Sequence, residues 1–190
     1  MYVLCDTCSV LMLIRIAPDM FIDQKYDCVT VPEVRQEFVQ TKKFKTKYPW
    51  REKYVAKIRA IPKTQLDNDV FQKAHSTVRT VHDTGLINPR TNKLFDLSRV
   101  DKLIISYAVA HNYVLSSVDN DLVDFAEQQF EKSVVRPLGI INDWLGRGLI
   151  DWDDSLQSII DDWTRCGEHR QPIDEIQKFK SLTGYLYVGP

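Results

Sequence analysis

Four short apolar runs, each next to a helical pattern, constrain the fold of this chain more than any other feature. They are rich in the β-branched and aromatic residues that favour strands, and they cover residues 2–5, 28–31, 113–116 and 133–135. Strands that alternate with helices predict a parallel sheet covered by helices on both faces. We therefore expect an α/β fold, a three-layer α/β/α sandwich whose central, mostly parallel sheet has four to five strands.

The remaining segments predict helices that are added to this sandwich. Residues 42–83 predict a helical arm that is broken at Pro62, and a turn-rich link follows it. Residues 150–190 predict a helical C-terminal extension packed on the sheet. A length of 190 residues fits one domain, and 44% hydrophobic residues supply its core. We expect a single domain over residues 1–190.

Several function classes are disfavoured by what the sequence lacks. It contains no glycine-rich phosphate-binding motif. Its longest apolar run, Leu103–Ala110, is far shorter than the roughly 20 residues that span a bilayer. The N-terminus has no basic residues before its apolar segment, so we expect no secretory signal, no membrane partner and a cytoplasmic location. Cys5 and Cys8 have the spacing of a redox or zinc half-site, but no second pair completes it, so we expect reduced, packed thiols.

Acidic residues stand where the predicted strands end. In an open parallel sheet these positions share one edge, so the carboxylates should converge and require a counter-cation. Oxygen ligands favour Mg²⁺ or Mn²⁺, which suit phosphoryl chemistry. The alternative is that Asp101 only complements a helix dipole and that Asp119 and Asp121 are turn or N-cap residues, whereas Glu37 lies too far into its helix for capping to explain it. Asp6 itself should be nearly buried, and unpaired burial is costly. The acids concerned are Asp6, Glu37, Asp101, Asp119 and Asp121.

Four segments around these acids resemble the PIN-domain ribonucleases, in order and spacing, over residues 1 to about 140. They are residues 6–11, 31–38, 101–108 and 115–122. The resemblance implies metal-dependent hydrolysis of RNA by an endonuclease, a toxin-like role with a protein antitoxin as partner, and a homodimer. It makes Asp6, Glu37, Asp101 and Asp119 the catalytic, metal-binding acids, with Asp121 as an accessory ligand. It also matches Thr7, Ser9 and Ser117 to supporting hydroxyl positions.

Two departures from the family pattern bear on these expected supporting contacts. Cys8 stands where the family often has Asn, and Ser117-Val118 stands where it often has Thr-Asn or Thr-Asp. The groups around the metal ligands are therefore expected to hold the ion less firmly.

The predicted arm is strongly basic. Residues 42–63 contain nine Lys or Arg against one Glu, with aromatic residues between them. Basic and aromatic side chains together are typical of single-stranded nucleic-acid binding, whereas the alternative is a solvated helix face with its aromatics packed inward. The candidate RNA contacts are Lys43, Lys45, Lys47, Arg51 and Lys53. Residues 151–175 hold eight acids against two arginines, so arm and tail could pair.

Taken together, these features predict a Mg²⁺- or Mn²⁺-dependent endoribonuclease that acts on RNA. The rival hypothesis is a catalytically silent PIN-like module that binds RNA or a protein. A phospho-accepting role for Asp6 is disfavoured, because the second Asp of such sites would fall at position 8, which is Cys. A histidine general base is not expected either, since the four histidines are dispersed along the chain: His75, His82, His111 and His169.

Overall fold

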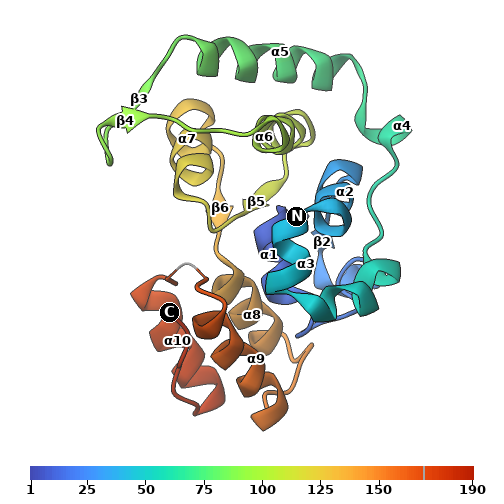
Figure 1. Cartoon of the computed structure of the whole chain (residues 1–190), viewed down its shortest axis with the longest axis vertical. Helices are drawn as coiled ribbons and strands as arrows, with labels where there is room; N and C mark the ends of the chain where they lie inside the picture. Colours follow the sequence, from blue (N-terminus) through green and yellow to red (C-terminus); the bar gives the residue numbers. More distant parts are fainter. Residues whose placement is uncertain (169) are drawn as a thin grey trace.

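The computed structural model describes residues 1–168 and 170–190, and its centre is a sheet of four parallel strands (Figure 1). The strand order is β2-β1-β5-β6. The strands are β1 (Val3–Cys5), β2 (Cys28–Val29), β5 (Val114–Ser116) and β6 (Val134–Val135). In the central pair, Cys5 lies opposite Ser116, so the two strands end side by side. The predicted α/β fold with a parallel sheet is confirmed, although β2 is shorter than the run 28–31 suggested.

Helices cover both faces of this sheet, as expected of a three-layer arrangement. Helices α6 and α7 contact each other on one face, and α1 contacts α8 on the other (Figure 1). Almost every side chain of helix α1 is buried, and most of its buried residues are apolar. These helices and the neighbouring α2 are α1 (Thr7–Leu13), α2 (Pro32–Gln40), α6 (Arg99–His111), α7 (Asn120–Phe130) and α8 (Pro137–Gly146).

The arm is more interrupted than the sequence indicated. Pro49 cannot donate a backbone hydrogen bond, and a 3₁₀ segment begins there in place of a continued α-helix. The long last helix of the arm packs on the outer side of α6, where the Phe71 and Tyr107 rings stack at 4.3 Å. The arm comprises α3 (Lys42–Lys47), η2 (Pro49–Lys57), α4 (Lys63–Leu66) and α5 (Asp69–Asp83).

The link after the arm contains a small antiparallel hairpin that the sequence did not predict. Its strands are β3 (Ile87–Asn88) and β4 (Lys93–Leu94). Asn92 takes a left-handed conformation in the turn, with φ of 54°, which asparagine tolerates better than most residues. A short 3₁₀ turn, η1 (Gln24–Tyr26), precedes β2.

The C-terminal extension is helical, as predicted, but among the described residues it packs on helix α8 and not directly on the sheet. Its helices are α9 (Asp154–Arg165) and α10 (Ile173–Thr183), and α10 contacts α8. The Tyr48 hydroxyl donates to the buried carboxylate of Glu168, whose Oε1 also lies 3.2 Å from Lys47 Nζ. Arg15 pairs with Asp162 at 2.6 Å. The expected pairing of opposite charges between arm and tail is therefore confirmed at Lys47 and Glu168.

All four cysteines are free thiols, as the uneven spacing predicted. Cys5 is fully buried on β1, where it acts as a packing residue. Among the residues that the structure describes, no helix has the length and apolarity needed to cross a bilayer.

Candidate active site at the carboxyl edge of the sheet

Asp6 is the first residue after β1, and the fold buries it almost completely. Its carboxylate is the N-cap of α1, where Oδ1 accepts from the Ser9 amide at 2.7 Å. Its other oxygen, Oδ2, accepts from the Ser117 hydroxyl at 2.6 Å. The chain reaches this arrangement because β1 and β5 are neighbours, and the Asp6 amide donates to the Ser116 carbonyl at 3.0 Å. The predicted supporting position of Ser117 is thus next to Asp6.

Burial raises the pKa of the Asp6 carboxyl to about 6. The hydrogen bonds from Ser117 and Ser9 act in the opposite direction, and the charge of Asp101 adds to the rise in pKa. Within the described ranges, no Lys or Arg forms an ion pair with Asp6. Asp6 is therefore a buried acid that lacks a cation of its own.

Asp101 acts on Asp6 through its charge, and Asp119 is linked to it by Ser117, whose hydroxyl accepts from the Asp119 amide at 3.0 Å and donates to Asp6; both acids also have structural roles. Asp101 forms a capping box with Ser98, whose amide donates to Asp101 Oδ2 at 2.8 Å. Burial raises the pKa of Asp101, and the charge of Asp119 contributes to the rise. Asp119 caps α7, with its Oδ1 accepting from the amides of Asp121 and Leu122. Both acids therefore cap helices, as the alternative predicted, and capping by one carboxylate oxygen is compatible with metal binding by the other.

Glu37 lies one turn into α2 and is linked to α1. The Thr7 hydroxyl donates to Glu37 Oε2, so Thr7, a predicted supporting residue, directly contacts a predicted metal-binding acid. One oxygen remains without a protein partner, among the described residues, on each of Glu37, Asp101 and Asp119. These are hard oxygen donors of the kind that Mg²⁺ and Mn²⁺ prefer.

The predicted metal-binding acids do not form a preformed metal site among the described residues. No group of three or more His, Cys, Asp or Glu side chains in residues 1–168 and 170–190 stands close enough together to hold a metal ion. The donor chemistry of Asp6, Glu37, Asp101 and Asp119 fits a divalent cation.

Asp121 does not join this cluster through its carboxylate. Its Oδ1 accepts from Asn88 Nδ2 at 3.0 Å, and its Oδ2 accepts from the Asp96 amide at 3.3 Å. Asn88 is fully buried and donates equally to Asp124, a buried acid that Arg90 pairs with at 2.7 Å. The accessory-ligand role expected for Asp121 is therefore not supported, because Asn88 of the hairpin and the Asp96 amide hold its two oxygens.

Arg136 is a residue near the site that the sequence reasoning missed. It follows β6 at the same edge of the sheet, and its guanidinium donates to the Ser117 carbonyl at 3.2 Å and to Asn120 Oδ1 at 2.9 Å. Burial lowers the pKa of Arg136, while nearby acids that include Asp6 oppose this change. The position of Arg136 in the sequence, directly after the fourth predicted strand and before Pro137, could have placed it at this edge. Arg136 therefore places a guanidinium at the acidic edge of the sheet.

The basic arm offers fewer free cations than its sequence predicted. Arg51 is 2% exposed, and it donates to the carbonyls of Phe38 and Val39 at the end of α2 at 2.7 and 2.8 Å. The expectation that Arg51 contacts RNA is therefore wrong, because the guanidinium is a buried cap of α2. Lys47 is paired with Glu168. The remaining candidates, Lys43, Lys45 and Lys53, are exposed.

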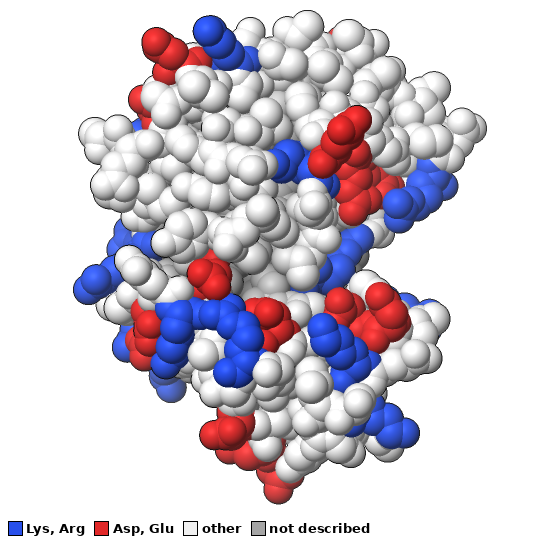
Figure 2. Space-filling view, turned by 180° about the vertical axis from the view of Figure 1, so that it is seen from behind, with Lys and Arg blue, Asp and Glu red and all other residues white. Residues whose placement is uncertain are grey.

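The arm's aromatic residues follow the alternative of inward packing. Phe44, Tyr48, Trp50 and Tyr54 contact one another in sequence, with ring centroids 5.7–5.8 Å apart, and pack against the core. No continuous basic surface is visible on the face shown in Figure 2, where Lys and Arg lie beside Asp and Glu.

The described histidines contact groups other than the predicted metal-binding acids. His75 contacts Ser106, His82 contacts Asp83, and His111 contacts the Leu66 carbonyl. His169 lies outside the described residues.

Comparisons of the chain with protein-family models, with curated proteins and with solved structures find no match.

Proposed function

We propose that this protein is a Mg²⁺- or Mn²⁺-dependent endoribonuclease whose active site is the acidic edge of the sheet. The observation that carries the proposal is Asp6, a buried carboxylate with a raised pKa, no ion-pair partner among the described residues and two further acids nearby. Burying such a group without a cation is costly, so its retention favours a role in binding one. The resemblance to PIN-domain ribonucleases supports the same function.

In this proposal Asp6, Glu37, Asp101 and Asp119 hold the cation, and Asp121 is not among the ligands. A bound divalent cation supplies an activated water and neutralises charge on the phosphodiester. The protein's own groups then orient the carboxylates: Ser117 and the Ser9 amide fix Asp6, and Thr7 fixes Glu37.

Arg136 has a distinct task in this proposal. Its guanidinium is held at the edge of the sheet by Ser117 and Asn120, and it would bind a non-bridging phosphate oxygen of the RNA. A cation in that place also limits the repulsion between the RNA backbone and the acids.

The test compares the wild type with Asp6→Asn, which removes one charge with almost no change of volume. RNA is incubated with each protein in Mn²⁺, in Mg²⁺ and in EDTA, and new ends are mapped. We expect cleavage only by the wild type with a divalent cation, and an increase in its melting temperature with Mn²⁺ that the variant lacks. Asp161→Asn, which alters an exposed acid of α9, is the matched control. Equal turnover by Asp6→Asn and the wild type would reject the proposed role.

A second candidate function is a catalytically silent module that binds RNA or a protein. The capping roles of Asp101 and Asp119 favour it, because they account for both acids without a metal ion. Under this hypothesis RNA binding survives EDTA, and no divalent cation produces cleavage. The toxin-like role, an antitoxin partner, a homodimer and a cytoplasmic location rest on the sequence and the resemblance alone.

A further inference from the structure

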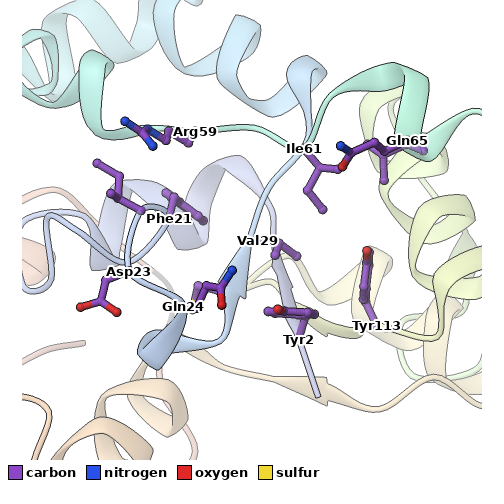
Figure 3. Close-up of a pocket in the computed structure, with 12 residues that line it drawn as sticks. Tyr2, Phe21, Asp23, Gln24, Val29, Arg59, Ile61, Gln65 and Tyr113 are labelled. Atoms are coloured by element: carbon purple, nitrogen blue, oxygen red, sulfur yellow. The ribbon is translucent and has the colours of Figure 1, made fainter.

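A cavity of about 490 Å³ lies at the opposite end of the strands from the acidic edge (Figure 3). Tyr2 and Tyr113, which directly precede β1 and β5, form part of its wall, whereas Asp6 and Asp119 follow these strands. The volume is within the range of small-molecule sites in proteins, roughly 300–1,000 Å³. It is therefore a separate candidate site, and its occupancy does not depend on the proposed nuclease function.

The cavity is walled by apolar and aromatic side chains from separate segments. Figure 3 shows Phe21 on one side, Tyr113 on the other, Tyr2 and Val29 along the floor, and Ile61 pointing in from the connection after η2. The Tyr2 and Tyr113 rings meet edge to face, with centroids 6.3 Å apart. Such a lining favours a flat, partly apolar ligand.

Four polar side chains around the cavity have no hydrogen-bond partner among the described residues. They are the hydroxyls of Tyr2 and Tyr113 and the side-chain amides of Gln24 and Gln65. In Figure 3 the Tyr113 side chain points toward Gln65, and Gln24 lies beside Tyr2. These groups can donate and accept, so they suit a ligand with several hydrogen-bonding edges.

The backbone of β2 adds a donor and an acceptor. The Val3 amide donates to the Asp27 carbonyl, so by strand alternation the amide and carbonyl of Cys28 point away from β1, toward the open edge of the sheet. The next outward group, the Thr30 carbonyl, already accepts from the Ile61 amide at 2.9 Å. Along the described part of this edge, the adjacent N–H and C=O of Cys28 have no hydrogen-bond partner, and Cys28 lines the cavity. This pair matches the neighbouring acceptor and donor on the edge of a nucleobase.

One charge at the cavity has no counter-ion. Asp23 is paired with Lys25 at 3.1 Å, whereas no acid among the described residues pairs with Arg59. A free guanidinium beside an aromatic cavity favours a ligand that carries an anionic group, and phosphate suits the fork of arginine donors.

We propose that this cavity binds a nucleoside monophosphate, with the base against Tyr2 and Tyr113 and its edge on the Cys28 backbone, and with the phosphate on Arg59. The same chemistry is present in a free mononucleotide and in the phosphorylated end of an RNA strand.

The test titrates AMP, CMP, GMP and UMP into the full chain in EDTA, so that no metal-dependent cleavage contributes. Binding is followed by calorimetry and by the amide shifts of Cys28 and Val29. Ribose 5-phosphate lacks the base, and adenosine lacks the phosphate, so both should bind at least tenfold more weakly. Arg59→Gln should weaken the best mononucleotide about ten- to a hundredfold, and Arg79→Gln, on the exposed face of α5, should not.

A 5′-phosphorylated trinucleotide distinguishes the two sources. Binding tenfold tighter than the mononucleotide assigns the site to a strand end, and equal or weaker binding assigns it to the free nucleotide. The proposal is overturned if no mononucleotide binds at about 5 mM, if ribose 5-phosphate binds as well as AMP, or if Arg59→Gln and Arg79→Gln bind alike.

Discussion

The burial of Asp6 predicts a specific dependence of stability on pH. Its folded-state pKa is about 6 against an ordinary value of 3.8, which corresponds to about 3 kcal/mol. Because the pKa is raised on folding, the neutral acid is the form that the fold prefers. The stability that Asp6 contributes is complete below about pH 3.8 and is lost as the pH rises through 6. Asp6→Asn cannot ionise, so its free energy of unfolding relative to the wild type should increase by about 2 kcal/mol between pH 4 and pH 8, since part of the change already takes place below pH 4.

Urea unfolding in EDTA, at five pH values between 4 and 8, measures this difference. Any cost of replacing the carboxylate hydrogen bonds from Ser9 and Ser117 shifts the whole curve but does not depend on pH in the same way. Asp161→Asn, which also removes one carboxyl group, is the control and should run parallel to the wild type. A difference between Asp6→Asn and the wild type that stays flat from pH 4 to pH 8 would show that the burial argument is wrong.

Three further predictions concern the arm and the hairpin. Arg51→Ala should lower the free energy of unfolding by about 2–4 kcal/mol, because two carbonyls of α2 lose their donor inside the protein, and Arg51→Lys should restore only part of it; urea unfolding measures both. Replacing the exposed lysines Lys43, Lys45 and Lys53 of the arm by glutamine should weaken single-stranded RNA binding and flatten its salt dependence. Fluorescence anisotropy in EDTA measures both, and an unchanged slope of affinity against salt would exclude the arm as a contact. Asn88→Ala should cost about 1–3 kcal/mol, since Asp124 loses a buried donor, and amide exchange of the hairpin should accelerate; protection equal to the wild type would contradict this role.

The sheet was predictable because its signals are local. Each strand is a run of apolar residues with its helix nearby, and parallel pairing then places the ends of β1 and β5 together. Asp6 was identifiable on the same basis, as a charge between two apolar segments. The contact between Asp6 and Ser117 follows from the register of the two strands.

The rest depends on contacts between residues far apart in the chain. Arg51 looks like a surface cation in sequence, and only the end of α2, 12 and 13 residues earlier, makes its burial favourable. The direction of the Asp121 side chain is set by Asn88, 33 residues away. Asn88 lies in a strand that is too short to give a sequence pattern. Sequence patterns of period 2 or 3.6 carry no information about such pairs.

The contact of Tyr48 with Glu168 has a practical consequence for handling the protein. A version shortened near residue 150 would uncover Tyr48, remove the acid that Lys47 pairs with and strip the cover from α8. Such a fragment should precipitate or bind nonspecifically to polyanions, which would be mistaken for RNA affinity. A purification tag at the amino end should leave Tyr2 free, because Tyr2 lines the cavity. The other option is a cleavable tag after Pro190, whose carbonyl accepts from the Gln171 amide at 3.4 Å.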